Sequence, residues 1–119
     1  MDRLIYHIAT ATDWAARTDA YVPERFDTEG FIHCSTSSQI ADVASRLFRG
    51  RDDLVVLLID PDRVFPFIRY ENLEGGHELY PHIYGPLNAG AILDSRPMCV
   101  DQGGNIVSEL PVSPTDTNR

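Results

Sequence analysis

Leu54-Val55-Val56-Leu57-Leu58-Ile59 (residues 54–59) is an unbroken aliphatic run, and it decides how the fold is built. Strands that are apolar at every position, on both faces, are typical of the buried centre of a sheet. The run is followed by Asp60-Pro61-Asp62, a sequence that favours a turn. We therefore expect residues 54–59 to form a central strand that other elements cover on both sides.

An amphipathic helix is expected before this strand. Its apolar positions recur at the helical spacing i, i+3, i+4, i+7 and i+8, and they are Ile40, Val43, Ala44, Leu47 and Phe48. Thr36 and Gln39 have the spacing of a capping box, in which Thr36 is the N-cap and Gln39 is the third helical residue. Gly50 predicts the C-terminal end of this helix.

The remaining pattern predicts strands on both sides of this unit. They are expected at residues 4–9, 29–34, 64–71 and 90–101, with residues 81–86 extended and residues 105–110 as the hairpin partner of the last strand. A second, short helix is expected over residues 14–17 with Thr12 as its N-cap, and residues 20–27 are expected to be loop. This order predicts an α+β fold with mostly antiparallel strands and two helices in the N-terminal half.

The length of the chain suits a single domain. The chain has 119 residues, and we expect a domain over residues 1–110 and a polar, disordered tail over residues 111–119. The net charge is -8 and every basic residue is an arginine, which argues against duplex nucleic acid or a membrane as partner, and against Schiff-base chemistry. Two cysteines make no disulfide framework, and no leader or membrane-spanning stretch is found, so a cytoplasmic location is expected.

His33 is a polar residue at the exit of an apolar strand, just before the expected helix start. Three hydroxyl residues follow nearby, namely Ser35, Thr36 and Ser37. Free amide groups at a helix N-terminus bind anions, so this stretch predicts a phosphate cradle beside an imidazole. The alternative is that Thr36 and Gln39 only cap the helix.

Other candidate residues lie at or near strand ends. His7 is expected to share a strand face with Ile5, and a single histidine there is more often a buried structural residue than a catalyst. Glu71 ends a strand, where the alternative is a solvated terminus. His82 and Tyr84 stand in a rigid, proline-flanked stretch that can hold them at a ligand or form a structural turn.

Metal binding and thiol chemistry have weaker support. No pair of histidines or cysteines has the close spacing of a strong ligand motif, although a spatial trio of His7, His33 and His82 stays open. Cys34 is adjacent to His33 on an expected strand, so the two side chains point to opposite faces and do not form a catalytic pair.

Several of these stretches together resemble the domain-of-unknown-function family DUF952 over about residues 3 to 97. They are Ile5-Tyr6-His7-Ile8, Trp14, Glu29-Gly30-Phe31-Ile32-His33-Cys34-Ser35, Gln39, Asp53-Leu54, Ile59-Asp60, Glu71 and Pro81-His82-Ile83-Tyr84-Gly85-Pro86. This family is similar to a compact form of the ADP-ribosyltransferase-like superfamily, which includes RNA 2′-phosphotransferases. The resemblance implies a split, curved β-sheet that grips NAD or an ADP-ribosyl group.

The resemblance also implies roles for single residues. His7 matches the first-strand position that anchors the cofactor, and Glu71 matches the acidic residue that stabilises an oxocarbenium-like transition state. His33 departs from the Tyr or Ser-Thr-Ser pattern of the second strand, and its spacing to Glu71 is short for a full-sized transferase.

We therefore expect an enzyme that acts on NAD, ADP-ribose or a phosphorylated nucleotide by ADP-ribosyl or phosphoryl transfer, with NAD as a substrate. The expected catalytic residues are His7, His33, Glu71 and His82. The expected ligand-binding residues are Ser35, Thr36, Gln39 and Tyr84, with phosphate held at the helix start by Thr36. The alternatives are a non-catalytic nucleotide- or anion-binding module and a small metal-dependent hydrolase.

Overall fold

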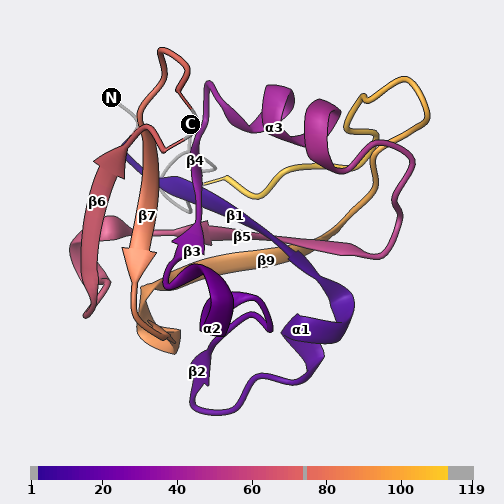
Figure 1. Cartoon of the computed structure of the whole chain (residues 1–119). Helices are drawn as coiled ribbons and strands as arrows, with labels where there is room; N and C mark the ends of the chain where they lie inside the picture. The colour runs from indigo at the N-terminus through magenta and orange to yellow at the C-terminus, as the bar shows by residue number, and fades with distance from the viewer. Residues whose placement is uncertain (1–2, 74, 113–119) are drawn as a thin grey trace, which may run out of the picture.

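The computed structural model describes residues 3–73 and 75–112, and it combines helices with antiparallel sheets (Figure 1). The largest sheet has the order β4-β1-β5-β9, where β1 is Ile5–Thr10, β4 is Ser35–Thr36, β5 is Leu54–Ile59 and β9 is Ile92–Met98. A three-stranded sheet has the order β3-β7-β6, where β3 is Ile32–His33, β7 is Tyr80–Tyr84 and β6 is Phe67–Glu71. A short pair joins β2 (Ala20–Tyr21) to β8 (Leu87–Asn88).

The expected central strand is confirmed. β5 pairs with β1 on one side and with β9 on the other, and its side chains alternate between two apolar clusters. Leu57 and Ile59 pack with residues of the three-stranded sheet, such as Ile32 and Ile83. The opposite face of β5 packs against α3, and its buried residues are Leu54, Val56 and Leu58. The continuous apolar run is explained by this double burial.

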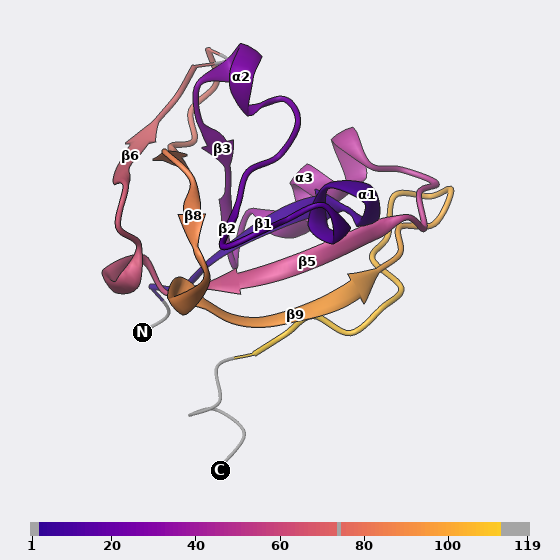
Figure 2. The same cartoon turned by 90° about the horizontal axis from the view of Figure 1, so that it is seen from below.

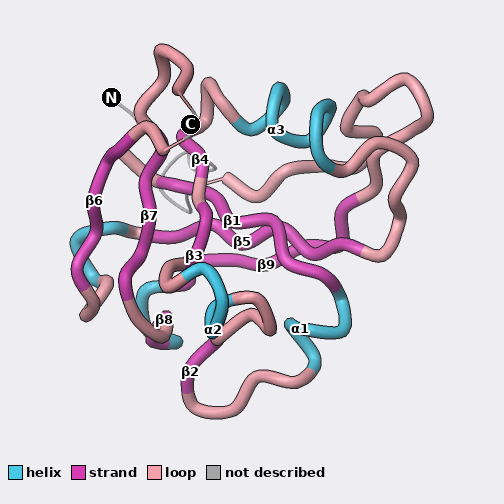
Figure 3. The backbone as a smooth tube through the Cα atoms, in the orientation of Figure 1, coloured by secondary structure: helices cyan, strands magenta, loops and turns pink. Residues whose placement is uncertain are grey.

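Three α-helices occur among the described residues, all before residue 48. Figure 3 colours them cyan. They are α1 (Ala11–Ala15), α2 (Phe26–Glu29) and α3 (Ile40–Leu47), with 3-10 turns η1 (Pro61–Arg63) and η2 (Ala89–Ala91) further on. The placement in the N-terminal half is as expected, but the expected number was two. α2 was missed because four residues are too short to show a helical period.

Two expected helix caps were wrong. α1 is capped by Thr10, whose Oγ1 accepts a hydrogen bond from the Asp13 amide at 3.0 Å, rather than by Thr12. α3 begins at Ile40 rather than after Thr36, because Thr36 is held extended by antiparallel pairing with Ile5. One half of the expected capping box remains, since the Thr36 amide donates to Gln39 Oε1 at 3.0 Å.

The C-terminal part is less regular than expected. The hairpin partner over residues 105–110 is reduced to an isolated bridge between Val100 and Ile106. Pro111 is buried and its carbonyl accepts a hydrogen bond from the Tyr6 hydroxyl at 3.1 Å, whereas residues 113–119 of the expected tail lie outside the described residues. No helix within the described part of the chain is long and apolar enough to cross a membrane.

The segment over residues 32–36 belongs to two sheets, and it positions the site. β3 pairs with β7, in register His33 to His82, and the Cys34 amide donates to the Pro81 carbonyl at 3.0 Å. Two residues later, β4 pairs with β1, in register Ser35 to Tyr6. The strands of the two larger sheets run at a steep angle to each other (Figure 2), so this segment turns from one direction to the other. His33 therefore lies where the two sheets meet.

Candidate active site

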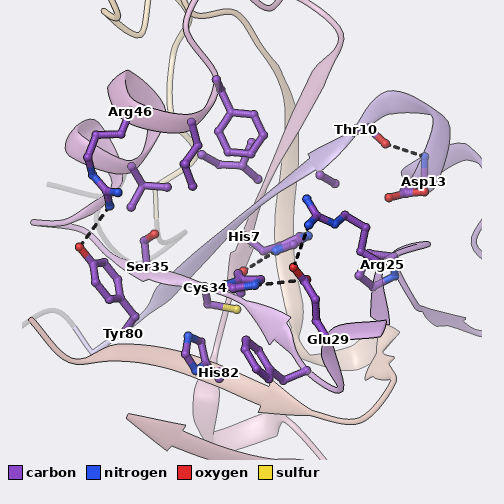
Figure 4. Close-up of a pocket in the computed structure, with 18 of the residues that line it drawn as sticks. His7, Thr10, Asp13, Arg25, Glu29, Cys34, Ser35, Arg46, Tyr80 and His82 are labelled. Carbon is purple, nitrogen blue, oxygen red and sulfur yellow. Dashed lines mark hydrogen bonds and ion pairs between the residues drawn. The ribbon is translucent and has the colours of Figure 1, made fainter. Parts of the chain in front are cut away.

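A cavity of about 420 Å³ lies beside this junction (Figure 4). Four of the expected site residues line it, namely His7, His33, Ser35 and His82. The volume is in the range of sites for small molecules. Part of the apolar face of α3 also lines the cavity, through Val43 and Leu47, and so does Phe48, which follows the helix.

His7 uses both ring nitrogens within the fold. Its Nδ1 lies 2.5 Å from the His33 carbonyl oxygen and its Nε2 lies 2.8 Å from the Tyr21 hydroxyl. A carbonyl can only accept, so Nδ1 carries the proton and Nε2 accepts from Tyr21. Burial lowers the pKa of His7 from 6.5 to about 4. His7 is therefore a neutral link between β1, β2 and β3, and the structure gives it no free nitrogen for a ribose hydroxyl or a shuttled proton.

His82 is oriented by a carboxylate. The ring is buried on β7, with 4% of its surface exposed, and its Nδ1 lies 2.9 Å from Glu71 Oε2. The Tyr84 hydroxyl donates to the same carboxylate oxygen. These hydrogen bonds, from Tyr84 first and then His82, lower the pKa of Glu71, which keeps it an acceptor. The proton of the Glu71–His82 bond therefore sits on Nδ1.

The other ring nitrogen of His82 is open. No hydrogen bond joins Nε2 to any described residue, and no buried side-chain nitrogen or oxygen among those residues lacks a partner. Nε2 therefore has no partner among the described residues, and it belongs to a ring that lines the cavity. Glu71 and Tyr84 lie behind the ring and are not among the described residues that line the cavity. Glu71 was expected to stabilise a ribosyl cation by its negative charge, and its carboxylate is instead hydrogen-bonded to His82 and Tyr84.

His33 has a carboxylate partner of its own. Its Nε2 lies 3.2 Å from Glu29 Oε1, and Glu29 Oε2 lies 3.3 Å from the Arg25 guanidinium. Glu29 and Arg25 both line the cavity, and neither was expected at the site. The signal that could have found them is their spacing, because Arg25, Glu29 and His33 follow one another at intervals of four residues.

Phe31 packs against both histidines of this wall. Its ring is stacked on His82 with centroids 4.2 Å apart, and it meets His33 edge-on at 4.7 Å. The rings of His33 and His82 lie 5.3 Å apart. Phe31 was not expected as a site residue, although it is among the residues that carry the family resemblance. Its packing limits the rotation of both imidazoles.

The expected phosphate cradle is not formed at Thr36. Thr36 is in a strand, and its Oγ1 lies 3.2 Å from the Ser38 hydroxyl. The Gln39 side chain accepts from the Thr36 amide and donates to Glu78 Oε1 and to the Leu79 carbonyl, both at 2.9 Å. Gln39 is therefore committed to the fold next to a carboxylate, an environment that disfavours an anion. Ser35 is the expected ligand-binding residue that does line the cavity.

Positive charge at the cavity comes instead from arginines. Arg25, Arg46 and Arg51 line it, and each is paired with a carboxylate, at 3.3 Å to Glu29, 2.8 Å to Asp42 and 2.6 Å to Asp53. Arg46 also lies 3.4 Å from the Tyr80 hydroxyl. A dashed line marks this contact in Figure 4. A guanidinium has five donors, so it can hold a carboxylate and a phosphate oxygen together.

Thiol and metal chemistry are not favoured by the arrangement. Burial raises the pKa of the Cys34 thiol, and its Sγ is 3.8 Å from the Ile32 carbonyl. The trio of His7, His33 and His82 does share the cavity, but His7 has no nitrogen left to coordinate a metal. Among the residues that the structure describes, no group of three histidine, cysteine or acidic side chains is placed to hold a metal ion.

Fold and site together define a small α+β protein with a cavity walled by two carboxylate-paired histidines. A family model described as "Protein of unknown function (DUF952)" matches residues 8–95, and the chain belongs to this family. The chain is similar to the crystal structure of protein CC0527 from Caulobacter crescentus, with 27% identity, a TM-score of 0.75, and coverage of 87% of this chain and 92% of that chain. For the solution NMR structure of CC0527 the identity is 28%, the TM-score 0.69 and the coverage 86% and 90%. No curated protein matches this chain.

Proposed function

We propose that the protein is an enzyme that acts on NAD, ADP-ribose or a phosphorylated nucleotide, with His82 as its acid–base residue. The observation that carries the proposal is the Glu71–His82 pair, in which a carboxylate lies 2.9 Å from Nδ1 and the Nε2 of a cavity-lining ring has no partner among the described residues. Paired carboxylate and imidazole groups of this kind are typical of enzymes that transfer protons at a reacting centre.

The chemistry follows from the tautomer. Glu71 holds the proton on Nδ1, so the lone pair of Nε2 can accept a proton from an attacking hydroxyl or water. The resulting imidazolium is stabilised by the charge of Glu71, which its own hydrogen bonds keep ionised. In this proposal Glu71 acts through His82 as a positioning residue, and Tyr84 fixes Glu71 in turn.

The lining supports a nucleotide-like ligand. Aromatic side chains offer faces on which a base can stack, namely Phe31, Phe48 and Tyr80. Arg25, Arg46 and Arg51 supply the charge for phosphate oxygens, and Ser35 adds a hydroxyl. The two antiparallel sheets that share residues 32–36 beside the cavity support, as part of the same proposal, an ADP-ribosyltransferase-like split sheet.

A turnover and binding panel tests the proposal. The protein is incubated separately with NAD, ADP-ribose and a 2′-phosphorylated RNA oligonucleotide, and products are read by mass spectrometry while affinity is measured by calorimetry. We expect turnover of at least one ligand, loss of that turnover in His82→Gln, and unchanged turnover in Glu78→Gln, whose carboxylate contacts Gln39 outside the cavity. Absence of turnover would overturn the proposal, and binding without turnover would favour a non-catalytic module instead.

A further inference from the structure

We propose that His33 and His82 form an acid–base pair, and that the substrate of the site is a phosphodiester that the pair hydrolyses. This inference rests on the proposed function of the same cavity and narrows it to one class of substrate. It assigns His33 the role of general acid and His82 the role of general base.

The two imidazoles are placed as a pair by the sheet itself. His33 on β3 and His82 on β7 are register partners, so their side chains leave the same face of neighbouring strands. Their ring centroids are 5.3 Å apart, and Phe31 contacts both rings. A phosphodiester hydrolysis needs one group on the side of the attacking oxygen and another on the side of the leaving oxygen. Two imidazoles at this separation can occupy both positions around one phosphorus atom.

Each imidazole has one nitrogen on a carboxylate and one nitrogen free of the described residues. Glu71 holds Nδ1 of His82 at 2.9 Å, which leaves Nε2, whereas Glu29 holds Nε2 of His33 at 3.2 Å, which leaves Nδ1. The carboxylates come from different elements, β6 and α2, so the two pairs are built independently. A single imidazole bound to a carboxylate is compatible with a structural role. Two such imidazoles, in register and lining one cavity, indicate that one donates a proton and the other accepts one.

The environments of the two rings fit the assigned roles. The His33 side chain is 51% exposed, so it can take up a proton from solvent between turnovers. His82 is buried and is reached through the cavity, where an attacking water would lie. Arg25 pairs with Glu29 at 3.3 Å and places a positive charge beside His33, where the charge of a phosphodiester would be held.

The proposed step is balanced by one water molecule. A proton of water passes to Nε2 of His82 as the water oxygen forms a bond to phosphorus. The bond from phosphorus to the leaving nucleoside oxygen breaks, and that oxygen takes the proton from Nδ1 of His33. The products are a phosphomonoester and an alcohol, and solvent returns a proton from His82 to His33.

Two phosphodiesters with different leaving groups test the assignment. Thymidylyl-thymidine has a leaving alkoxide that needs a proton, whereas the p-nitrophenyl ester of thymidine 5′-monophosphate releases a nitrophenolate that does not. In His33→Gln we expect kcat/KM to fall about 10²- to 10⁴-fold on the dinucleotide and less than about tenfold on the nitrophenyl ester. In His82→Gln we expect a comparable loss on both esters, because both need an activated water.

A second variant and a structural control complete the experiment. Glu29→Gln keeps His33 but removes its carboxylate, so we expect a smaller loss that is again confined to the dinucleotide. Thermal unfolding of each variant shows whether the fold is intact. Equal losses on both esters in His33→Gln, or no loss on either, would overturn the inference. Failure of the wild-type protein to hydrolyse either ester would also overturn it, whereas the proposed function fails if NAD, ADP-ribose and 2′-phosphorylated RNA are not turned over.

Discussion

The carbonyl oxygen of His33 accepts a hydrogen bond from Nδ1 of His7 across 2.5 Å, so an imidazole of β1 holds the strand that carries the proposed acid. The other nitrogen of His7 is bonded to Tyr21, which ties β2 to the same point. A histidine expected to react with a ligand is thus a link between three strands. Its neutral state is a condition of the fold, and this gives the first prediction.

Acidification is expected to destabilise the protein through His7. Burial lowers the pKa of folded His7 to about 4 from 6.5, so the unfolded chain binds more protons between these values. The contribution of neutral His7 to the free energy of unfolding is fully present above pH 6.5. It is lost as the pH falls towards 4, and the loss amounts to about 3 kcal/mol at most. Urea unfolding at pH 7.5 and pH 4.5 measures the difference. His7→Gln should show a smaller difference, and an unchanged one would contradict the prediction.

Tyr21→Phe is expected to destabilise the protein through the loss of its contact with His7. The Tyr21 hydroxyl is the donor to Nε2 of buried His7, and its loss leaves that nitrogen without a partner. Such a buried, unpaired group costs about 1–3 kcal/mol of unfolding free energy. Tyr70→Phe is the matched control, because Tyr70 is 47% exposed and should change stability by less than about 0.5 kcal/mol. Equal effects of the two substitutions in urea unfolding would refute the role given to Tyr21.

Glu71→Gln is expected to reduce activity more than stability. The amide can still accept from Nδ1 of His82, but it supplies no charge to the imidazolium. We expect kcat/KM on the substrate found in the panel to fall about 10²-fold. Glu78→Gln makes the same chemical change at a carboxylate bonded to Gln39 and should retain full activity. An active Glu71→Gln variant would remove the support for His82 as acid–base residue.

Gly30→Ala is expected to disturb the elements that carry Glu29 and Phe31. Gly30 ends α2 with φ of +83°, a conformation that costs a residue with a side chain about 1–2 kcal/mol. Nothing lies within 4 Å of an added Cβ, so the cost is conformational rather than steric. Gly30→Asn should cost less, because asparagine tolerates this region. Equal unfolding free energies for the two variants would show that the backbone conformation is not the cause.

Periodicity was a good guide to the larger elements. The aliphatic run of β5 predicted its burial on both faces, and the apolar stripe of α3 predicted the helix but only part of its burial, since Ile40 and Ala44 are buried and Leu47 is exposed. The capping box gave a wrong helix start at Thr36, because the pairing of Thr36 with Ile5 outweighs its local preference for a helix N-terminus. The change of sheet at Cys34 could not be predicted, because no local pattern specifies which of two neighbours an extended segment will pair with.

For the site, the sequence predicted which histidines gather but not what each does. His7, His33 and His82 do line one cavity. The neutral state of His7 depends on Tyr21, fourteen residues away, and the orientation of His82 depends on Glu71, so tertiary contacts decide the chemistry. Glu29 was overlooked because α2 is only four residues long. The partner of Glu29 is His33, which lies beyond Gly30, the residue that ends the helix.

The segment from Ile32 to Thr36 has a fixed length, because its first part pairs with β7 and its last part pairs with β1. Removing one residue from it would shift one pairing by a single position, and every side chain on the shifted part would turn to the opposite face. Either His33 would swing away from His82 or Ser35 would leave its place beside Tyr6. The length of this short connection is therefore as strict a requirement as the identity of the residues within it.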